Sequence, residues 1–208
     1  LPANFSNHAT MVAGVMAAAR NGTGAVGVAY NATVGSEYLE PNTLANWGNM
    51  ANYDVANNSW GYSPDFNLTN LDPNTSESLG DIALANAQYA ASNGRGGKGT
   101  ILVESAGNTR STQGTAEGSL FNNNRFSIEV GAINQTADLS TLAPASTPFS
   151  SPGASLLVAA PGSNIVSTSQ LVVTDQGSIF GSNTDTMQGT SFSTPIVSAI
   201  TALMLEAN

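Results

Sequence analysis

A serine stands at the head of a long apolar segment near the end of this 208-residue chain. Ser191 lies within Gly189–Pro195, and the apolar run Ile196–Leu205 follows directly. The Gly-Thr pair before the serine indicates a tight turn, and a proline is tolerated only in the first turn of a helix, so a helix must begin close to Ser191. Such a helix points its free N–H groups and the positive end of its dipole at whatever the serine attacks, which suits the oxyanion of an acyl transfer. On its own the pattern is more often an ordinary buried helix with a serine N-cap.

Two further segments supply the partners that such a serine needs. His8, the only histidine, heads a second apolar helix, and Asn108 follows the apolar strand Ile101–Ala106 in a Gly-Asn turn. A serine hydroxyl is a weak nucleophile until a base removes its proton, and an imidazole with a pKa of about 6.5 can act as base and then as acid. The amide of Asn108 can donate to the oxyanion. Taken singly, a lone histidine and a turn asparagine are more often structural.

These segments occur in the order of the signatures of one protease family. The chain resembles the subtilisin-like serine proteases, whose signatures are His-Gly-Thr-x-Val-Ala-Gly, a strand that ends in Ala-Gly-Asn, and Gly-Thr-Ser-x-x-x-Pro. Four further segments are similar to the kexin and furin branch of that family: Gly27–Ala32, Ser59–Gly61, Gly94–Gly99 and Ala202–Asn208. The resemblance covers residues 1–208, which we expect to form one subtilisin-like peptidase catalytic domain.

The resemblance implies a role for each matching residue. Ser191 would be the nucleophile and His8 the general base, and Asn108 would hold the oxyanion together with the Ser191 backbone N–H, with support from Thr190. Ala9 stands where the family usually has glycine, so the resemblance does not fix the position of the His8 side chain.

Two short segments would bind the substrate. They would pair with its extended backbone as an added strand and form the walls of the pocket for the residue before the cut: Ser59, Trp60 and Gly61 on one side, Ser105, Ala106 and Gly107 on the other. From the residues alone, Trp60 fits the end of a strand with its ring in the core equally well.

Kexin-like enzymes prefer basic residues before the cut and line their pockets with acids. After Trp60 and Gly61 this chain keeps one shifted aspartate, Asp65, and Glu104 stands at a strand position where the convertases have an aromatic. Either carboxylate would favour Arg or Lys in the substrate. Glu104 is equally compatible with a solvated strand residue.

A catalytic aspartate is the missing part of the resemblance. In the family it lies in an Asp-[Ser/Thr/Asp]-Gly motif before the histidine, and Leu1–Asn7 contains none. We therefore expect the domain to be truncated at its N-terminus and nearly inactive by itself, because loss of this carboxylate costs roughly 10⁴ in turnover.

The loop after the histidine helix is similar to a structural calcium site of the family. Its ligands would be the side chain of Asn21 and the carbonyls of Ala19, Thr23 and Ala25, because calcium prefers oxygen. A carboxylate from upstream normally completes that site. Without it we expect calcium to bind weakly or not at all, and a plain glycine turn is the alternative.

Composition excludes several kinds of protein. The formal net charge is −9, which has the wrong sign for binding nucleic acid or an anionic membrane. Neither a stretch of eighteen apolar residues nor a basic leader is present, so we expect no membrane span and no signal peptide in these residues. The absence of cysteine excludes disulfides and a thiol nucleophile.

The resemblance also implies a location and a domain context. We expect an extracellular or cell-surface location, and further domains before residue 1 and after residue 208.

Periodicity predicts an α/β fold. Helical patterns cover His8–Ala19, Ser78–Ser92 and Ser191–Ala207, and the first and last are apolar nearly all round, so we expect them to be buried. Alternation of helices and strands predicts a parallel sheet, which in this family is a three-layer sandwich with helices on both faces. The expected strands are Thr33–Leu39, Asp54–Trp60, Thr100–Ala106, Phe126–Ile133 and Leu156–Ala159.

The pattern as a whole favours a serine endopeptidase that acts on a peptide or protein substrate. A non-catalytic subtilisin-like domain that binds extended peptides is the main alternative, since the aspartate is missing. Retention of His8, Asn108 and Ser191 together favours the enzyme. An esterase acting on small acyl groups would use the same chemistry and is a lesser alternative.

Overall fold

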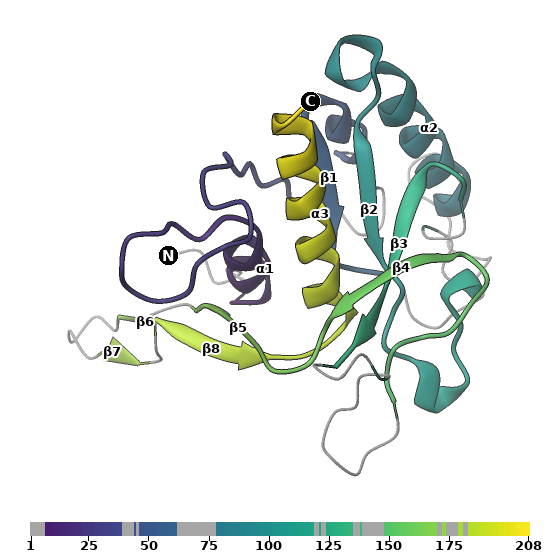
Figure 1. Cartoon of the computed structure of the whole chain (residues 1–208). Coiled ribbons are helices and arrows are strands. Elements are labelled where there is room, and N and C mark those ends of the chain that lie inside the picture. The colour runs from purple at the N-terminus through teal and green to yellow at the C-terminus, as the bar shows by residue number, and fades with distance from the viewer. Residues whose placement is uncertain are drawn as a thin grey trace.

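A parallel four-stranded sheet forms the centre of the molecule, with strand order β1-β2-β3-β4. The structure is a computed structural model that describes residues 7–38, 44, 46–61, 78–118, 121, 124–134, 138, 148–169, 172–173, 179–180 and 183–208. The strands are β1 (Val55–Asn58), β2 (Ile101–Ser105), β3 (Ser127–Ile133) and β4 (Leu156–Pro161). Figure 1 shows helix α3 across one face of this sheet and α2 behind the other, which confirms the predicted three-layer arrangement.

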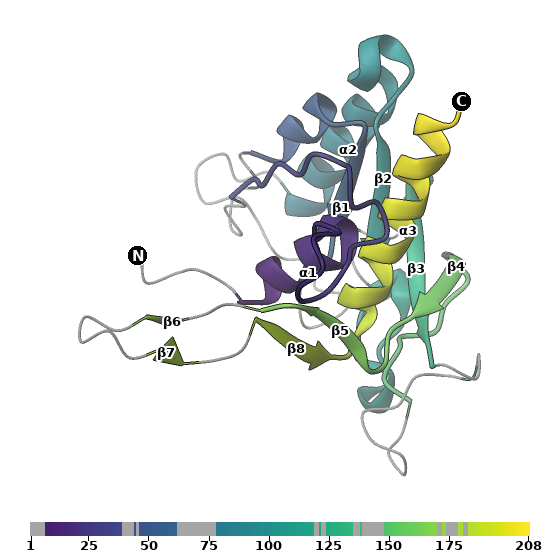
Figure 2. The same cartoon turned by 60° about the vertical axis from the view of Figure 1, so that its left-hand side comes forward.

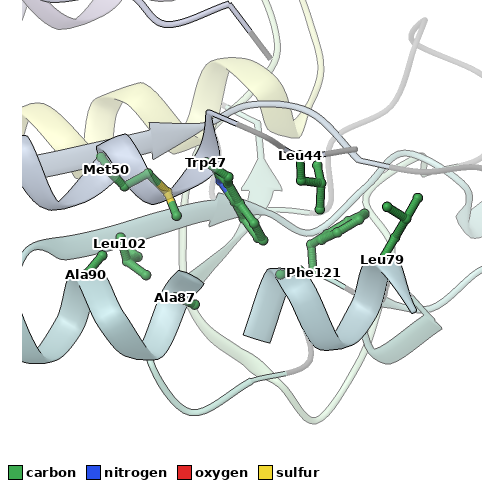
Figure 3. Packing of buried hydrophobic residues seen from close by; sticks show 10 residues of the cluster. Leu44, Trp47, Met50, Leu79, Ala87, Ala90, Leu102 and Phe121 are labelled. Atoms are coloured by element: carbon green, nitrogen blue, oxygen red, sulfur yellow. The ribbon is translucent and has the colours of Figure 1, made fainter. Parts of the chain in front are cut away.

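Helix α2 (Leu79–Gly97) covers one face. It begins after Ser78, whose hydroxyl accepts the Asp81 N–H at 3.4 Å as an N-cap. Its alanine stripe lets the helix approach the sheet closely, and the larger side chains of the short helix η1 (Trp47–Asn52) fill the remaining space (Figure 3). The buried cluster on this face consists of Leu44, Trp47, Met50, Ala56, Leu79, Ala83, Ala87, Ala90, Leu102 and Phe121.

Helix α3 (Thr190–Glu206) covers the other face, and α1 (Asn7–Ala17) packs against α3 (Figure 2). The predicted burial of α3 is correct only for its first half. Phe192 is 1% exposed, whereas Met204 near the C-terminal end is 65% exposed. The exposed apolar residues of the second half, Ile200, Leu203 and Met204, lie on one stripe of the helix, and the apolar pattern alone could not show that this stripe is left uncovered.

Two small antiparallel pairs follow the sheet in the chain: β5 (Ile165–Thr168) with β8 (Thr184–Met187), and β6 (Val172–Val173) with β7 (Ile179–Phe180). Strand β5 supports the histidine helix directly. The Ser167 hydroxyl donates to the Met11 carbonyl at 2.6 Å, and a Cβ on Gly14 would lie 2.0 Å from the Thr168 hydroxyl oxygen. Gly14 is therefore required for the close approach of helix and strand.

Four of the five predicted strands are confirmed as β1 to β4, with shifts of one or two residues at their ends. The prediction of a strand over Thr33–Leu39 is wrong for its described part, residues 33–38, which form no ladder and are exposed. Strand-like composition does not make a strand unless a neighbour takes its backbone hydrogen bonds. Here the side chain of Glu37 instead accepts from the Tyr53 hydroxyl at 2.7 Å and the Asn49 amide at 3.2 Å.

Candidate active site

Four predicted site residues come from the ends of four elements. Ser59 directly follows β1, Asn108 lies in the turn after β2, Ser191 is in the first turn of α3, and His8 is in the first turn of α1. Because the carboxyl ends of parallel strands meet at one edge of a sheet, Ser59 and Asn108 are brought to the same edge, where α3 begins. Hydrogen bonds join Ser59 to Ser191 and Asn108 to Thr190, and His8 contacts Phe192 through its ring.

Gly189 makes the sharp turn into α3 that the sequence predicts. Its φ is 137°, and a Cβ at this position would lie 3.5 Å from the side-chain nitrogen of Asn108. The Gly189 N–H donates to the Gly162 carbonyl at 2.8 Å, which fixes the start of the helix against the loop after β4. The helix N-terminus is therefore held in a single place relative to the Asn108 turn.

The side-chain oxygen of Asn108 accepts both the backbone N–H of Thr190 at 2.9 Å and its hydroxyl at 3.1 Å. A backbone N–H can only donate, so the atom that faces it must be the oxygen, and this fixes the orientation of the amide. The turn that carries Asn108 is braced by Ser151, whose N–H donates to the Gly107 carbonyl and whose hydroxyl accepts the Thr109 N–H. The amide hydrogens of Asn108 are thus left on the side away from the Thr190 N–H.

Ser191 and Ser59 hold each other by two reciprocal hydrogen bonds. The Ser191 hydroxyl donates to the Ser59 carbonyl at 3.2 Å, and the Ser59 hydroxyl donates to the Ser191 carbonyl at 2.8 Å. The predicted nucleophile therefore lies against the predicted substrate-binding segment, although 132 residues separate them in the chain.

The His8 ring contacts the side chain that follows Ser191. It meets the ring of Phe192 edge-on, with centroids 5.4 Å apart. Burial lowers the pKa of His8 below its ordinary value, so the imidazole is neutral at neutral pH, as a general base must be. Within the described ranges His8 makes no hydrogen bond. Ala9 is exposed on the helix, so its methyl group does not disturb the packing of His8.

The two predicted substrate-binding segments lie side by side. The Ser105 hydroxyl donates to the Trp60 carbonyl at 3.5 Å, and Gly61 is exposed with open space around its Cα. The ring of Trp60 packs against Trp47 and Phe121, so it belongs to the core on the α2 face. Ala106 is buried and its N–H donates to the Val130 carbonyl, whereas Gly107 turns the chain with a φ of 94°.

Glu104 is neither a pocket wall nor a solvated residue. It is 1% exposed and pairs in register with Glu129 on β3, which is equally buried. Burial, and next the neighbouring Glu129, raise the pKa of Glu104 well above its usual range, so the side chain is not a surface charge. The other candidate carboxylate, Asp65, lies outside the described residues.

The loop predicted to bind calcium is held by hydrogen bonds between its own residues. The Asn21 side-chain oxygen accepts the Thr23 N–H at 3.1 Å and its hydroxyl at 3.0 Å, and the Ala19 carbonyl accepts the Asn21 N–H. Calcium needs six to eight oxygen ligands, and no group of three or more acidic, histidine or cysteine side chains that could hold a metal occurs among the described residues. In this conformation Ala19, Asn21, Thr23 and Ala25 do not fit a calcium cage.

The sequence analysis missed Asn57 and Phe192, which contact the predicted site residues Ser59 and His8, and it missed Ser198, which contacts Asn57. Asn57 and Ser198 are polar residues inside a strand and a helix, and a hydroxyl or amide in such a place carries no local signal of its partner. The edge-on contact of Phe192 with His8 joins two helices from opposite ends of the chain.

Comparison with known proteins agrees with this architecture. The model of the subtilase family matches residues 2–208. Human proprotein convertase subtilisin/kexin type 4 is 27% identical over 215 residues, covering 100% of this chain and 26% of the convertase. Human furin is 28% identical over 217 residues, covering 99% of this chain and 25% of furin. The chain thus spans about a quarter of the length of these relatives.

Solved structures share the fold at lower identity. A protease from Pseudoalteromonas arctica has a TM-score of 0.66 and 24% identity, covering 99% of this chain and 60% of that one. The Aeromonas sobria serine protease, in complex with its chaperone, has a TM-score of 0.70 and 19% identity, covering 96% and 40%. No helix in the described part of the chain is long and apolar enough to cross a membrane. With a family model that matches nearly its whole length, the chain is a member of the subtilase family, of the kexin and furin branch.

Proposed function

We propose that the protein is a serine endopeptidase that forms an acyl-enzyme on Ser191. One observation carries this proposal. The Thr190 N–H fixes the oxygen of Asn108, so the amide hydrogens are free to donate to an oxyanion at the start of α3. If Asn108 served only to cap α3 through Thr190, nothing would require a serine at the next position of the helix, which is Ser191.

In the proposed reaction the Ser191 hydroxyl oxygen attacks the carbonyl carbon of the substrate while its proton passes to His8. The Asn108 amide and the Ser191 N–H hold the resulting oxyanion. When the C–N bond breaks, His8 returns the proton to the leaving amine. A water molecule then attacks the acyl-enzyme with His8 again as base, and the product acid and free Ser191 result. The lowered pKa of His8 keeps it ready to accept the proton at neutral pH.

Substrate would bind as an added strand along Ser59 to Gly61, with Ser105 to Gly107 opposite. The Ser59 carbonyl now accepts the Ser191 hydroxyl at 3.2 Å. A substrate N–H that takes this carbonyl would release the hydroxyl toward His8. The buried Glu104 offers no charge to a basic side chain in the pocket, so we infer that any preference for Arg or Lys depends on another carboxylate.

His8 needs an orienting group. Within the described ranges it makes no hydrogen bond, so we infer that a carboxylate from outside these ranges fixes its tautomer during catalysis. Export to the cell surface or beyond and additional domains are proposals that rest on the family resemblance.

Covalent labelling tests the proposal. A fluorophosphonate should label the full-length protein, and Ser191→Ala should abolish the labelling. Ser193→Ala is the matched control, because Ser193 is on the same helix but donates to the Pro161 carbonyl. Labelling that persists in Ser191→Ala would show that the nucleophile lies elsewhere.

The second candidate is a non-catalytic domain that binds extended peptides. The absence of a hydrogen-bonded partner of His8 among the described residues favours it, as does the Ser191 hydroxyl being turned to a carbonyl. Peptide binding without labelling or hydrolysis would identify this function.

A further inference from the structure

The carbonyl of Ser191 lacks its normal partner within the helix. In an α-helix this carbonyl accepts the N–H of the residue four positions later, which here is Pro195. Proline has no N–H, so the helix itself leaves the Ser191 carbonyl without a donor. Ser191 and Pro195 lie in the first turns of α3, where the start of the helix must hold the nucleophile.

The hydroxyl of Ser59 takes the place of the missing N–H. It donates to the Ser191 carbonyl at 2.8 Å, and Ser59 is 8% exposed, so water does not compete easily. The carbonyl of the same residue accepts the Ser191 hydroxyl at 3.2 Å. The end of β1 thus holds the nucleophile through both its backbone and its side chain.

Two further polar groups determine where the single proton of Ser59 points. The Asn57 amide nitrogen donates to the Ser59 hydroxyl oxygen at 3.0 Å, so the Ser59 proton must be directed elsewhere, and the Ser191 carbonyl receives it. Asn57 presents its nitrogen to Ser59 because its oxygen faces Ser198, whose hydroxyl donates to it at 2.9 Å. Ser198 also lies 3.1 Å from the Thr194 carbonyl, the longer of its two contacts, so we assign its single proton to Asn57.

We propose that Ser198, Asn57 and Ser59 form a directional hydrogen-bond relay that positions Ser191, with Ser59 as the substitute for the N–H that Pro195 removes. Ser198 is 2% exposed and two turns along α3 from Ser191, so the relay leaves the helix, crosses β1 and returns to the first turn of the helix. It couples the nucleophile to the strand end that binds substrate. This inference rests on the proposed peptidase function.

If the relay positions Ser191, variants that break it should lower kcat and leave KM nearly unchanged. Ser59→Ala removes the donor but keeps the carbonyl that would bind substrate, and Ser198→Ala removes the group that orients Asn57. Each should lower kcat and the rate of fluorophosphonate labelling by roughly three- to tenfold, the size expected when one neutral hydrogen bond is lost. KM should change by less than about twofold.

Thr201→Val is the matched control. It also removes a hydroxyl from α3, but this hydroxyl donates only within the helix, to the Val197 carbonyl at 2.8 Å. It should keep the wild-type rates.

A restored backbone N–H provides the decisive variant. Pro195→Ala gives the Ser191 carbonyl its own helical donor, so Ser59→Ala should cost less in the Pro195→Ala background than in the wild type. A purely structural role of Ser59 would not produce this rescue. Circular dichroism and the free energy of unfolding of each variant show that it is folded before its rates are compared.

The outcomes separate the two proposals. If the wild type labels at Ser191, and Ser198→Ala behaves as Thr201→Val does or Pro195→Ala fails to reduce the cost of Ser59→Ala, the relay is wrong and the peptidase function stands. If the full-length wild-type protein does not label at Ser191, the peptidase function is wrong and the relay has no catalytic role.

Discussion

The buried carboxyl group of Glu104 makes the stability of the protein depend on pH in an unusual direction. Its side chain is 1% exposed, and no described side chain donates a hydrogen bond to either of its oxygens. All five Lys and Arg residues lie in the described part of the chain, and the ion pair recorded there joins Arg95 to Asp54 at 3.5 Å. A buried carboxylate without a cation is costly, so the folded protein keeps Glu104 protonated.

The direction of this pH dependence follows from the raised pKa of Glu104. Below the unfolded pKa of about 4.5, Glu104 is protonated in both the folded and the unfolded protein, so its ionisation does not affect the free energy of unfolding. Above it the unfolded chain releases the proton while the folded protein retains it. The free energy of unfolding therefore falls as pH rises, by about 1.4 kcal/mol per pH unit for one proton, until the folded pKa is reached.

Glu104→Gln keeps the size and polarity of the side chain but has no proton to lose. We expect its free energy of unfolding to approach the wild-type value near pH 4 and to exceed it increasingly above pH 5, by up to about 1.4 kcal/mol per pH unit. Urea denaturation at half-unit intervals from pH 4 to pH 8, followed by circular dichroism, measures both curves.

Glu117→Gln is the control, because the pKa of Glu117 is shifted in the opposite direction to that of Glu104. Hydrogen bonds from backbone N–H groups, first its own and then that of Ala154, lower the pKa of Glu117, so its contribution is lost as pH falls. Parallel curves for the wild type and Glu104→Gln above pH 5 would refute the reasoning, because they would mean that Glu104 ionises freely in the folded protein.

Four further predictions concern the site and its supports. Phe192→Ala should hydrate His8 and raise its pKa toward the ordinary value, so the rising limb of kcat/KM against pH should move to higher pH; an unmoved limb would contradict burial as the cause. Asn108→Ala should lower kcat by roughly 10²–10³ with little change in KM, the cost of one oxyanion donor in the subtilisin example, and steady-state peptide hydrolysis measures it. Gly14→Ala should destabilise the protein by about 1–3 kcal/mol in urea unfolding, because its Cβ would overlap a threonine hydroxyl of β5; an unchanged midpoint would show that helix and strand separate easily. Millimolar calcium should shift the melting temperature little relative to EGTA, and a large shift that Asn21→Ala abolishes would show that the loop opens to bind the ion.

Apolar periodicity predicted the sheet and the helices that position the site. The predicted helix at His8 begins at Asn7, and the one at Ser191 begins at Thr190. The starts of α2 and α3 are marked in the local sequence, by the capping hydroxyl of Ser78 and by Gly189 and Pro195.

Elements without local signals could not be predicted. Strands β5 to β8 are two to four residues long and form through pairing with each other, and β5 also contacts α1. Residues 33–38 show the reverse case, a strand-like composition without a partner strand in the described structure. Glu104 illustrates the same limit for a side chain, because only the register with Glu129 reveals that it is buried beside a second carboxyl group.

The mutual contact of Ser59 and Ser191 also has a consequence for the order of folding. It closes a loop of 132 residues, whereas the turns of α2 and α3 form between near neighbours in the chain. Contacts between distant segments are entropically expensive and tend to form after local structure. The proposed nucleophile should therefore reach its final geometry among the last events of folding, after the helix that carries it has formed. During partial unfolding we expect the same contact to open early, so the proposed catalytic geometry should be lost while most helical structure remains.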